Sequence, residues 1–138
     1  MDKIKQVIVL RKDLGMSFGK AVAQACHVAL NSYKVSDASH IEKWEAEGVT
    51  KVVLETYSEA SLKKLHAKAT KLGLPCDLIL DEGRTEFNGE HHYTALAIGP
   101  CPAELINKIT GHLALYSYES KIPAKFRLLS KLKSFFSK

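Results

Sequence analysis

Residues 6–30, QVIVLRKDLGMSFGKAVAQACHVAL, contain the feature that decides the fold, a buried strand that runs directly into a helix. Val7 to Leu10 is a short apolar run, rich in β-branched residues, between polar flanks. Such a run is typical of a strand buried on both faces of a sheet. Gly15 and Gly19 allow the backbone to turn, and Ser17 is a good N-cap for the helix that follows. The stretch therefore predicts a strand whose charged end points at a helix N-terminus.

Charged residues surround this predicted corner. Arg11, Lys12 and Asp13 follow the strand, and Lys20 lies in the first turn of the helix. A helix N-terminus has unpaired N–H groups and the positive end of the helix dipole, so an anion or phosphate is a natural guest. An ordinary solvated turn fits the same residues. This stretch alone leaves both interpretations open.

Length and composition predict one soluble intracellular domain. With 138 residues, of which 46% are hydrophobic, the chain can form a single adequate core. Cys26, Cys76 and Cys101 stand apart in apolar contexts without a CxxC pair, which favours reduced thiols in the core and no structural zinc. No apolar run approaches the roughly 20 residues of a membrane span. We expect a cytoplasmic protein.

The positive net charge belongs to the C-terminal segment. The chain has a net charge of +5, but all 15 acidic residues lie at or before Glu119, while six of the 20 basic residues lie after it. The body of the chain is therefore nearly neutral. Net charge alone does not make that body a nucleic-acid binder.

The remaining pattern predicts an α/β fold with a mixed four-stranded sheet. Helices are expected at 17–33, 37–47, 58–72 and 102–111, and strands at 7–10, 51–56, 76–80 and 93–98. Helical connections favour parallel strands, and the helix-free connection between the last two strands favours antiparallel pairing. The element order βααβαββα thus predicts three layers, α/β/α, with helices on both faces of the sheet.

Residues that resemble a nucleotide-binding loop, a metal site and a Cys-His nucleophile are present, but their arrangement does not suit these functions. Gly15 to Ala21 resembles a Walker A loop, but it has three residues between the glycines instead of four and Ala21 in place of Ser or Thr. The adjacent His91 and His92 diverge and do not form a metal site. Cys26 and His27 are helical neighbours that point in different directions, so a Cys-His nucleophile is not expected. We predict no metal, no cofactor and no covalent catalysis.

Polar residues at the strand ends remain as the candidate site. They are Arg11, Lys12 and Asp13 after the first strand, Asp81, Arg84 and Thr85 after the third, and Thr94 within the fourth. Lys20, Gln24 and His27 recur at spacings of four and three, which places them on one helix face. Ligands of open α/β sheets bind at the carboxyl ends of strands, so we expect the first two groups to meet beside Lys20.

Five blocks in this chain resemble the archaeal and eukaryotic type of peptidyl-tRNA hydrolase. They are VIVLRKDL at 7–14, MSFGK with Ala23, Gln24 and His27 at 16–27, DEGRT at 81–85, AIGP at 97–100 and ITGHL at 109–113. The resemblance spans residues 4–115. It implies a cytosolic homodimer that cleaves the ester between a peptide and the 3′ end of tRNA. It also implies a mixed four-stranded sheet between helical layers.

The resemblance also carries over site residues. Lys20, Asp81, Thr85 and Thr94 match the family's proposed site. Ester hydrolysis needs a placed water, a proton acceptor, donors for the oxyanion and cations for nearby phosphates. We assign Asp81 to the water, Lys20 to the oxyanion or the terminal phosphate, and the two threonines to water or ribose hydroxyls. The chain departs from the family at Glu82, where alanine is usual, and at residues 90–92.

Other polar residues receive supporting roles. Arg11, Lys12 and Arg84 are expected to hold the backbone of the tRNA acceptor end. Asp13, Gln24 and His27 are expected to support the site from behind. For His27, a packing role against the sheet is the alternative. A noncatalytic tRNA- or protein-binding module on the same fold is the alternative for the whole chain.

The C-terminal segment lies outside the resemblance. We divide the chain into a peptidyl-tRNA hydrolase domain at 1–116 and a basic extension at 117–138. In the extension Phe126, Leu129, Leu132 and Phe136 recur at spacings of three and four among basic residues, which indicates an amphipathic helix on docking. Residues 121–138 are expected to contact a ribosome, another nucleic acid or an anionic membrane. A solubilising or packing extension is the alternative.

Overall fold

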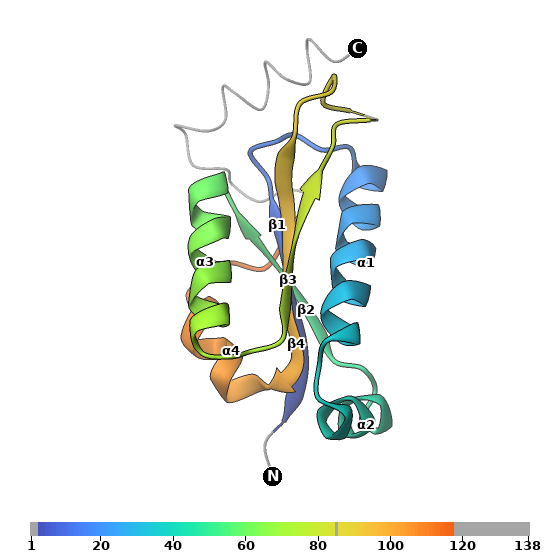
Figure 1. Cartoon of the computed structure of the whole chain (residues 1–138), viewed down its shortest axis with the longest axis vertical. Coiled ribbons are helices and arrows are strands. Elements are labelled where there is room, and N and C mark those ends of the chain that lie inside the picture. Colours follow the sequence, from blue (N-terminus) through green and yellow to red (C-terminus); the bar gives the residue numbers. More distant parts are fainter. Residues whose placement is uncertain (1–2, 85, 118–138) are drawn as a thin grey trace.

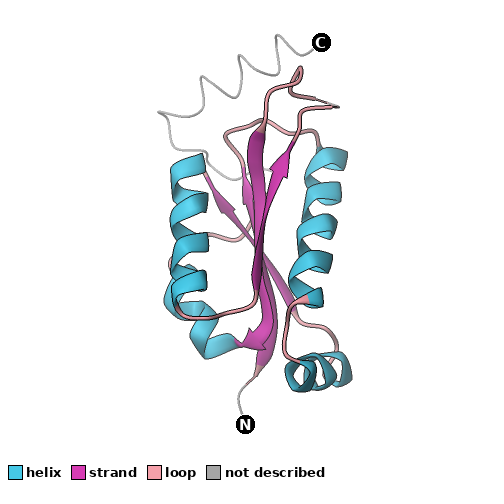
Figure 2. Ribbon diagram, in the orientation of Figure 1, coloured by secondary structure: helices cyan, strands magenta, loops and turns pink. Residues whose placement is uncertain are grey.

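A four-stranded sheet lies between two layers of helices (Figures 1 and 2). The computed structural model describes residues 3–84 and 86–117. Its elements are β1 (Ile4–Arg11), α1 (Phe18–Lys34), α2 (Ala38–Ala46), β2 (Lys51–Thr56), α3 (Glu59–Lys71), β3 (Cys76–Asp81), β4 (His92–Pro102) and α4 (Ala103–Thr110). This order and the three layers confirm the fold predicted from the sequence.

The sheet is mixed, with strand order β2-β1-β4-β3. β1 pairs with β2 in parallel, and β4 runs antiparallel to both β1 and β3. Because only β4 is reversed, the carboxyl ends of β1, β2 and β3 lie at one end of the sheet together with the start of β4. This end of the sheet is called the upper end below, as it is drawn in Figure 1.

Strand β1 is buried on both faces, as its sequence predicts. Val7 and Val9 pack in one apolar cluster, while Ile8 and Leu10 pack in another on the α1 side. The strand begins at Ile4, earlier than the apolar run suggests, because Gln6 is also buried. The Gln6 amide donates hydrogen bonds to the backbone oxygens of Ala29 at 2.9 Å and Gly99 at 3.1 Å.

Helix α1 begins where its capping residue predicts. The Ser17 hydroxyl accepts a hydrogen bond from the Lys20 backbone N–H at 3.2 Å. The helix buries Ala21, Gln24 and Val28 against the sheet. Their spacing leaves the adjacent face of α1, which carries Lys20, turned towards β3.

The three cysteines were expected in the core, but only one of them is fully buried. Cys101 is buried, and burial raises its pKa to about 12. Cys76 is half-buried, but Cys26 is exposed, so the prediction was wrong for Cys26. The reason is that residue 26 lies on the α1 face that points away from the sheet. Separately, within residues 3–84 and 86–117 no helix has both the length and the apolar character needed to cross a bilayer.

The two edges of the sheet differ. Along β2, Leu54 forms an antiparallel bridge with Leu115, and Tyr116 donates its N–H to Val53 at 2.9 Å. Residues 114–116 therefore cover the β2 edge. In the described part of the chain, no segment pairs in this way with the outer edge of β3.

The buried carboxylate of Glu55 binds the chain just after the residues that cover the β2 edge. Glu55 accepts hydrogen bonds from the Ser117 N–H at 3.1 Å and from the Tyr57 hydroxyl, and the Lys12 ammonium lies 4.0 Å away. Burial and the bond to Glu55 raise the pKa of Tyr57 to about 12. Glu55 thus links the ends of β1 and β2 to Ser117, after which the predicted basic extension continues.

Replacing this carboxylate by an amide is expected to destabilise the fold. Glu55→Gln keeps the shape but removes the charge opposite Lys12 and turns one acceptor into a donor. We expect urea unfolding to show a loss of about 1–3 kcal/mol in the free energy of unfolding. Glu47→Gln, at the exposed carboxylate of the Lys43–Glu47 pair, is the control and should change stability by less than about 0.5 kcal/mol. Equal stabilities of the two variants would contradict a role for Glu55 in fastening this segment.

Candidate active site

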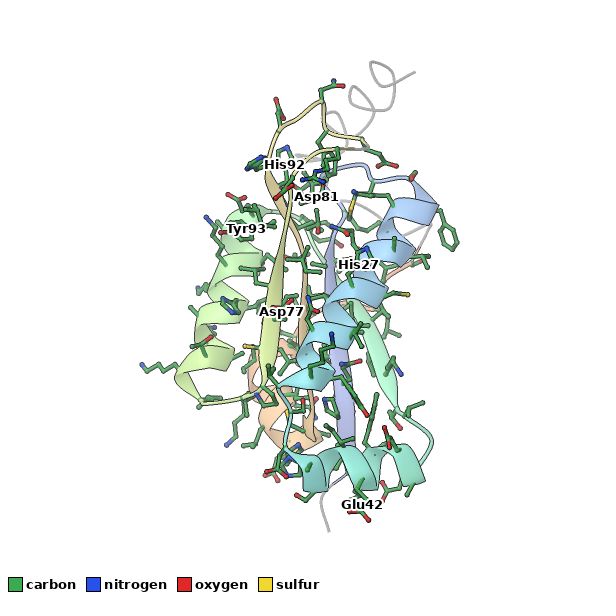
Figure 3. All side chains as sticks on the ribbon, turned by 45° about the vertical axis from the view of Figure 1, so that its right-hand side comes forward. His27, Glu42, Asp77, Asp81, His92 and Tyr93 are labelled. Carbon is green, nitrogen blue, oxygen red and sulfur yellow. The ribbon has the colours of Figure 1, made fainter. Side chains whose placement is uncertain are left out.

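A groove of about 510 Å³ lies between α1 and β3 and reaches the upper end of the sheet. It is lined by Lys20, Gln24, His27, Leu30 and Asn31 from α1, and by Ile79, Leu80, Asp81, Glu82 and Arg84 from β3 and the turn after it. Figure 3 shows His27 on α1 facing the strand that ends at Asp81. The groove therefore unites the helix face and the strand end that the sequence singled out.

An ion pair closes the upper part of the groove. The Lys20 Nζ lies 2.8 Å from the Asp81 Oδ1, and both side chains are 13% exposed. The other carboxylate oxygen, Oδ2, accepts the Gly83 N–H at 3.1 Å. Both oxygens of Asp81 are therefore held by donors, which fixes the orientation of the carboxylate.

Only glycine fits at the position that supports Asp81. Gly83 has a φ of +75°, and a Cβ placed there would lie 2.4 Å from the Glu90 backbone oxygen. A side chain at this position would push the loop away from Glu90. The glycine thus keeps the N–H that holds Asp81 within hydrogen-bonding distance.

A buried hydrogen bond lies in the layer between α1 and β4. The Gln24 Nε2 donates to the Thr94 Oγ1 at 2.7 Å, and both residues are buried. The supporting role of Gln24 stays a prediction. His27 is instead exposed and lines the groove, so the alternative of a packing histidine was wrong. The reason is that Gln24 and Val28 occupy the sheet-facing positions of this part of α1.

Arg11 at the end of β1 and Asp13 just after it do not join the groove. The Arg11 guanidinium binds the Asp13 carboxylate at 2.6 and 3.1 Å and the Tyr93 backbone oxygen at 3.0 Å. It lies 3.9 Å from Glu59 at the start of α3, on the opposite face of the sheet from α1. Successive strand residues point to opposite faces, which explains this separation from Lys20. Asp13 therefore supports Arg11.

Lys12 lies at the β2 side of the upper end. Its ammonium is 4.0 Å from Glu55 and 4.9 Å from the centre of the Tyr116 ring. It also donates to the Ser117 backbone oxygen. The structure therefore engages both Arg11 and Lys12 in contacts within the chain, and their binding to tRNA stays a prediction.

One contact at the upper end of the sheet was not predicted. The Glu86 carboxylate accepts the Ser17 backbone N–H at 3.2 Å and the Ser17 hydroxyl. The chain thus supplies its own anion at the helix N-terminus where an anion was predicted. Phe87, next to Glu86, places its ring 5.8 Å from the Lys20 Nζ. Glu86 and Ser17 are far apart in the sequence, so no spacing indicates their contact.

The other residues of the predicted site lie at the rim or outside the described chain. Arg84 pairs with Glu82 at 2.7 Å, and its side chain is 84% exposed. Glu82 therefore turns towards Arg84 rather than forming a carboxylate pair with Asp81. Thr85 lies outside the described residues, so its role stays a prediction. Among residues 3–84 and 86–117, no cluster of three or more His, Cys, Asp or Glu residues is arranged to hold a metal ion.

The groove has the groups needed for hydrolysis of an ester. A carboxylate can accept a proton from water, and an ammonium 2.8 Å away can donate to an oxyanion. Thr94 is fully buried and is not part of the groove lining; its hydroxyl accepts a hydrogen bond from Gln24, which does line the groove.

Comparisons with known proteins show the family of this chain. The family model described as "Peptidyl-tRNA hydrolase PTH2" matches residues 4–116. A peptidyl-tRNA hydrolase of Halobacterium salinarum is 44% identical over 113 residues, covering 82% of this chain and 100% of the relative. That of Methanocaldococcus jannaschii is 43% identical over 115 residues, covering 81% and 99%. The mitochondrial peptidyl-tRNA hydrolase 2 of Homo sapiens is 44% identical over 115 residues, covering 81% and 64%.

A solved structure extends the comparison to the fold alone. It is a protein of unknown function from Agrobacterium tumefaciens, with a TM-score of 0.53 and 16% identity, covering 85% of this chain and all of that one. The family model and the relatives above 40% identity carry the assignment. This chain belongs to the peptidyl-tRNA hydrolase PTH2 family.

Proposed function

We propose that this protein hydrolyses the ester bond between a peptide, or an N-blocked amino acid, and the 3′ end of tRNA. The observation that carries the proposal is the Lys20–Asp81 pair in the groove of a chain from this family. The relatives are named as hydrolases, which favours an enzyme over a noncatalytic binding module. The reaction would recycle peptidyl-tRNA released from ribosomes.

The geometry supports distinct roles for the two members of the pair. Asp81 accepts the proton of the attacking water, since its carboxylate is oriented by Gly83 and Lys20. Lys20 donates to the developing oxyanion or to the terminal phosphate. Thr85 is assigned to the water or the ribose hydroxyls, and the buried Thr94 acts on the groove through its hydrogen bond with Gln24.

Contacts with the RNA are proposed from the rim of the groove. Arg84 is the most accessible of the three predicted cations, and its guanidinium already lies beside the groove. Arg11 and Lys12 are held by acidic partners within the chain, so they reach phosphates only if they exchange those partners. His27 would support the site from its exposed place in the groove and not from behind it.

Release of free tRNA from N-acetyl-aminoacyl-tRNA by the purified protein tests the proposed function. The unblocked aminoacyl-tRNA is the matched control, because it has the same ester and the same RNA. We expect rapid release from the blocked substrate and much slower release from the unblocked one. Binding of both substrates without release of tRNA would instead identify a noncatalytic module.

The setting of the activity is also proposed from the resemblance. We infer a homodimer that acts in the cytoplasm, in translation. Sedimentation at micromolar concentration should then give twice the chain mass. A monomer would contradict the dimer without affecting the assignment of the groove.

The C-terminal extension is expected to add affinity for anionic partners. Residues 118–138 lie outside the described residues, so the domain boundary and the amphipathic helix stay predictions. Deleting residues 120–138 should preserve folding and hydrolysis but weaken binding to tRNA. The salt slope of binding should fall by about 0.7 for each single-stranded phosphate contact that is lost. Thermal unfolding is the control measurement, and a truncated chain that cannot fold would show that the segment belongs to the core.

A further inference from the structure

The outer edge of β3 runs beside the groove that holds the Lys20–Asp81 pair. β3 is the last strand of the sheet, and the described chain pairs nothing with its outer side. An edge strand directs the N–H and C=O groups of alternate residues outward, which makes it a template for another extended chain. The opposite edge, on β2, is already covered by residues 114–116. Among the described residues, the uncovered edge is therefore the one next to the candidate active site.

The groove beside this edge has the length of a short extended peptide. One end is the Lys20–Asp81 pair, and near the other end Asn31 donates to the Asp77 Oδ2 at 3.1 Å. Figure 3 shows Asp77 and Asp81 along the same strand with His27 opposite them on α1. Four residue steps of a strand cover about 13 Å. The groove therefore accommodates about four residues of an extended chain beside β3.

The charges of the groove do not favour an RNA backbone. Its lining contains two cations and two carboxylates, and these form the pairs Lys20–Asp81 and Arg84–Glu82. A polyanion would gain little from such a neutral surface. Leu30 and Leu80 add apolar contact area, since they are 52% and 45% exposed. A neutral peptide backbone with mixed side chains suits this surface better.

We propose that the peptidyl part of the substrate binds along β3 as an added antiparallel or parallel strand, with its ester end at the Lys20–Asp81 pair. This inference rests on the proposed function and deepens it. Pairing through the main chain is the same for any peptide sequence. It would let one groove accept the varied peptides carried by tRNA. The RNA then leaves the ester past the rim of the groove, where Arg84 lies.

Peptidyl-tRNAs with different peptide lengths test the proposal. For the wild-type protein we expect kcat/KM to rise as an N-acetylated peptide grows from one to about four residues, and then to level off. A single N-methyl group on a peptide amide should lower kcat/KM about two- to tenfold at alternate positions, because only those N–H groups face β3. Replacing alanine by glycine or leucine in the peptide should have a smaller effect.

Two variants at equally exposed leucines distinguish an effect of charge in the groove from an effect of charge elsewhere on the surface. Leu30→Glu places a charge in the groove, and Leu72→Glu places it at the end of α3, where the side chain is 51% exposed. The ratio of kcat/KM for the four-residue substrate to that for N-acetyl-aminoacyl-tRNA should fall in Leu30→Glu and stay at the wild-type value in Leu72→Glu. An unchanged ratio in both variants would overturn the proposal.

The outcomes distinguish this inference from the proposed function. If the protein releases tRNA from N-acetyl-aminoacyl-tRNA but shows no dependence on peptide length, the strand inference fails and the hydrolase remains. The same holds if N-methylation has an equal effect at every position. If neither substrate is hydrolysed, the proposed function itself fails.

Discussion

Asp81→Asn is expected to lower the turnover of N-acetyl-aminoacyl-tRNA by about 10² to 10⁴-fold. Asparagine keeps the shape of the side chain and can still accept the Gly83 N–H, but it cannot accept a proton from water. The substitution also leaves the Lys20 ammonium without the carboxylate that lies 2.8 Å away. Removing a negative charge does not weaken phosphate binding directly, so affinity for tRNA should be unchanged or slightly higher.

Single-turnover kinetics and equilibrium binding check this expectation together. The neighbouring carboxylate provides a matched control, because Glu82→Gln removes the same charge one residue away. Glu82 is turned towards Arg84, so its loss should leave turnover within a few-fold of the wild type. Equal losses of turnover in the two variants would show that the total charge of the groove, and not the placed Asp81 carboxylate, drives the reaction.

The fold was predictable because local signals and burial agree along the chain. Val7 to Leu10 and the Ser17 cap each act through neighbouring residues, and the structure places both as expected. The strand limits were less accurate where polar residues are buried. Gln6 lies in the extended part of β1 and bonds to α1 and to β4, which an apolar pattern does not reveal.

The part of the candidate site that lies on one element was predictable from residue spacing. Lys20, Gln24 and His27 share one helix face, and Asp81 ends the strand beside it. The prediction that Arg11 lies beside Lys20 was wrong. The strand ends do meet at one end of the sheet, but Arg11 points to the α3 face, since successive side chains of a strand point to opposite faces. The Glu86–Ser17 contact depends on the path of a loop, and no local rule fixes that path.

Lys20→Ala is expected to reduce both turnover and affinity, unlike Asp81→Asn. The ammonium is the cation in contact with the Asp81 carboxylate, so its loss removes the donor for the oxyanion and also leaves a carboxylate of low exposure without that partner. If Lys20 also binds the terminal phosphate, the salt slope of tRNA binding should shrink by about 0.7. Lys64→Ala is the control, because this exposed lysine on α3 lies outside the groove.

The two substitutions together separate chemistry from binding. Because Lys20 and Asp81 are in contact, the double variant should lose less turnover than the product of the single losses predicts. Turnover of saturating tRNA should fall in both single variants, whereas affinity should fall only in Lys20→Ala. Equal losses of affinity with normal turnover of bound tRNA would mean that the pair anchors the substrate while another group activates water. If the pair performs the chemistry, both variants therefore lose turnover, but they differ in their affinity for tRNA.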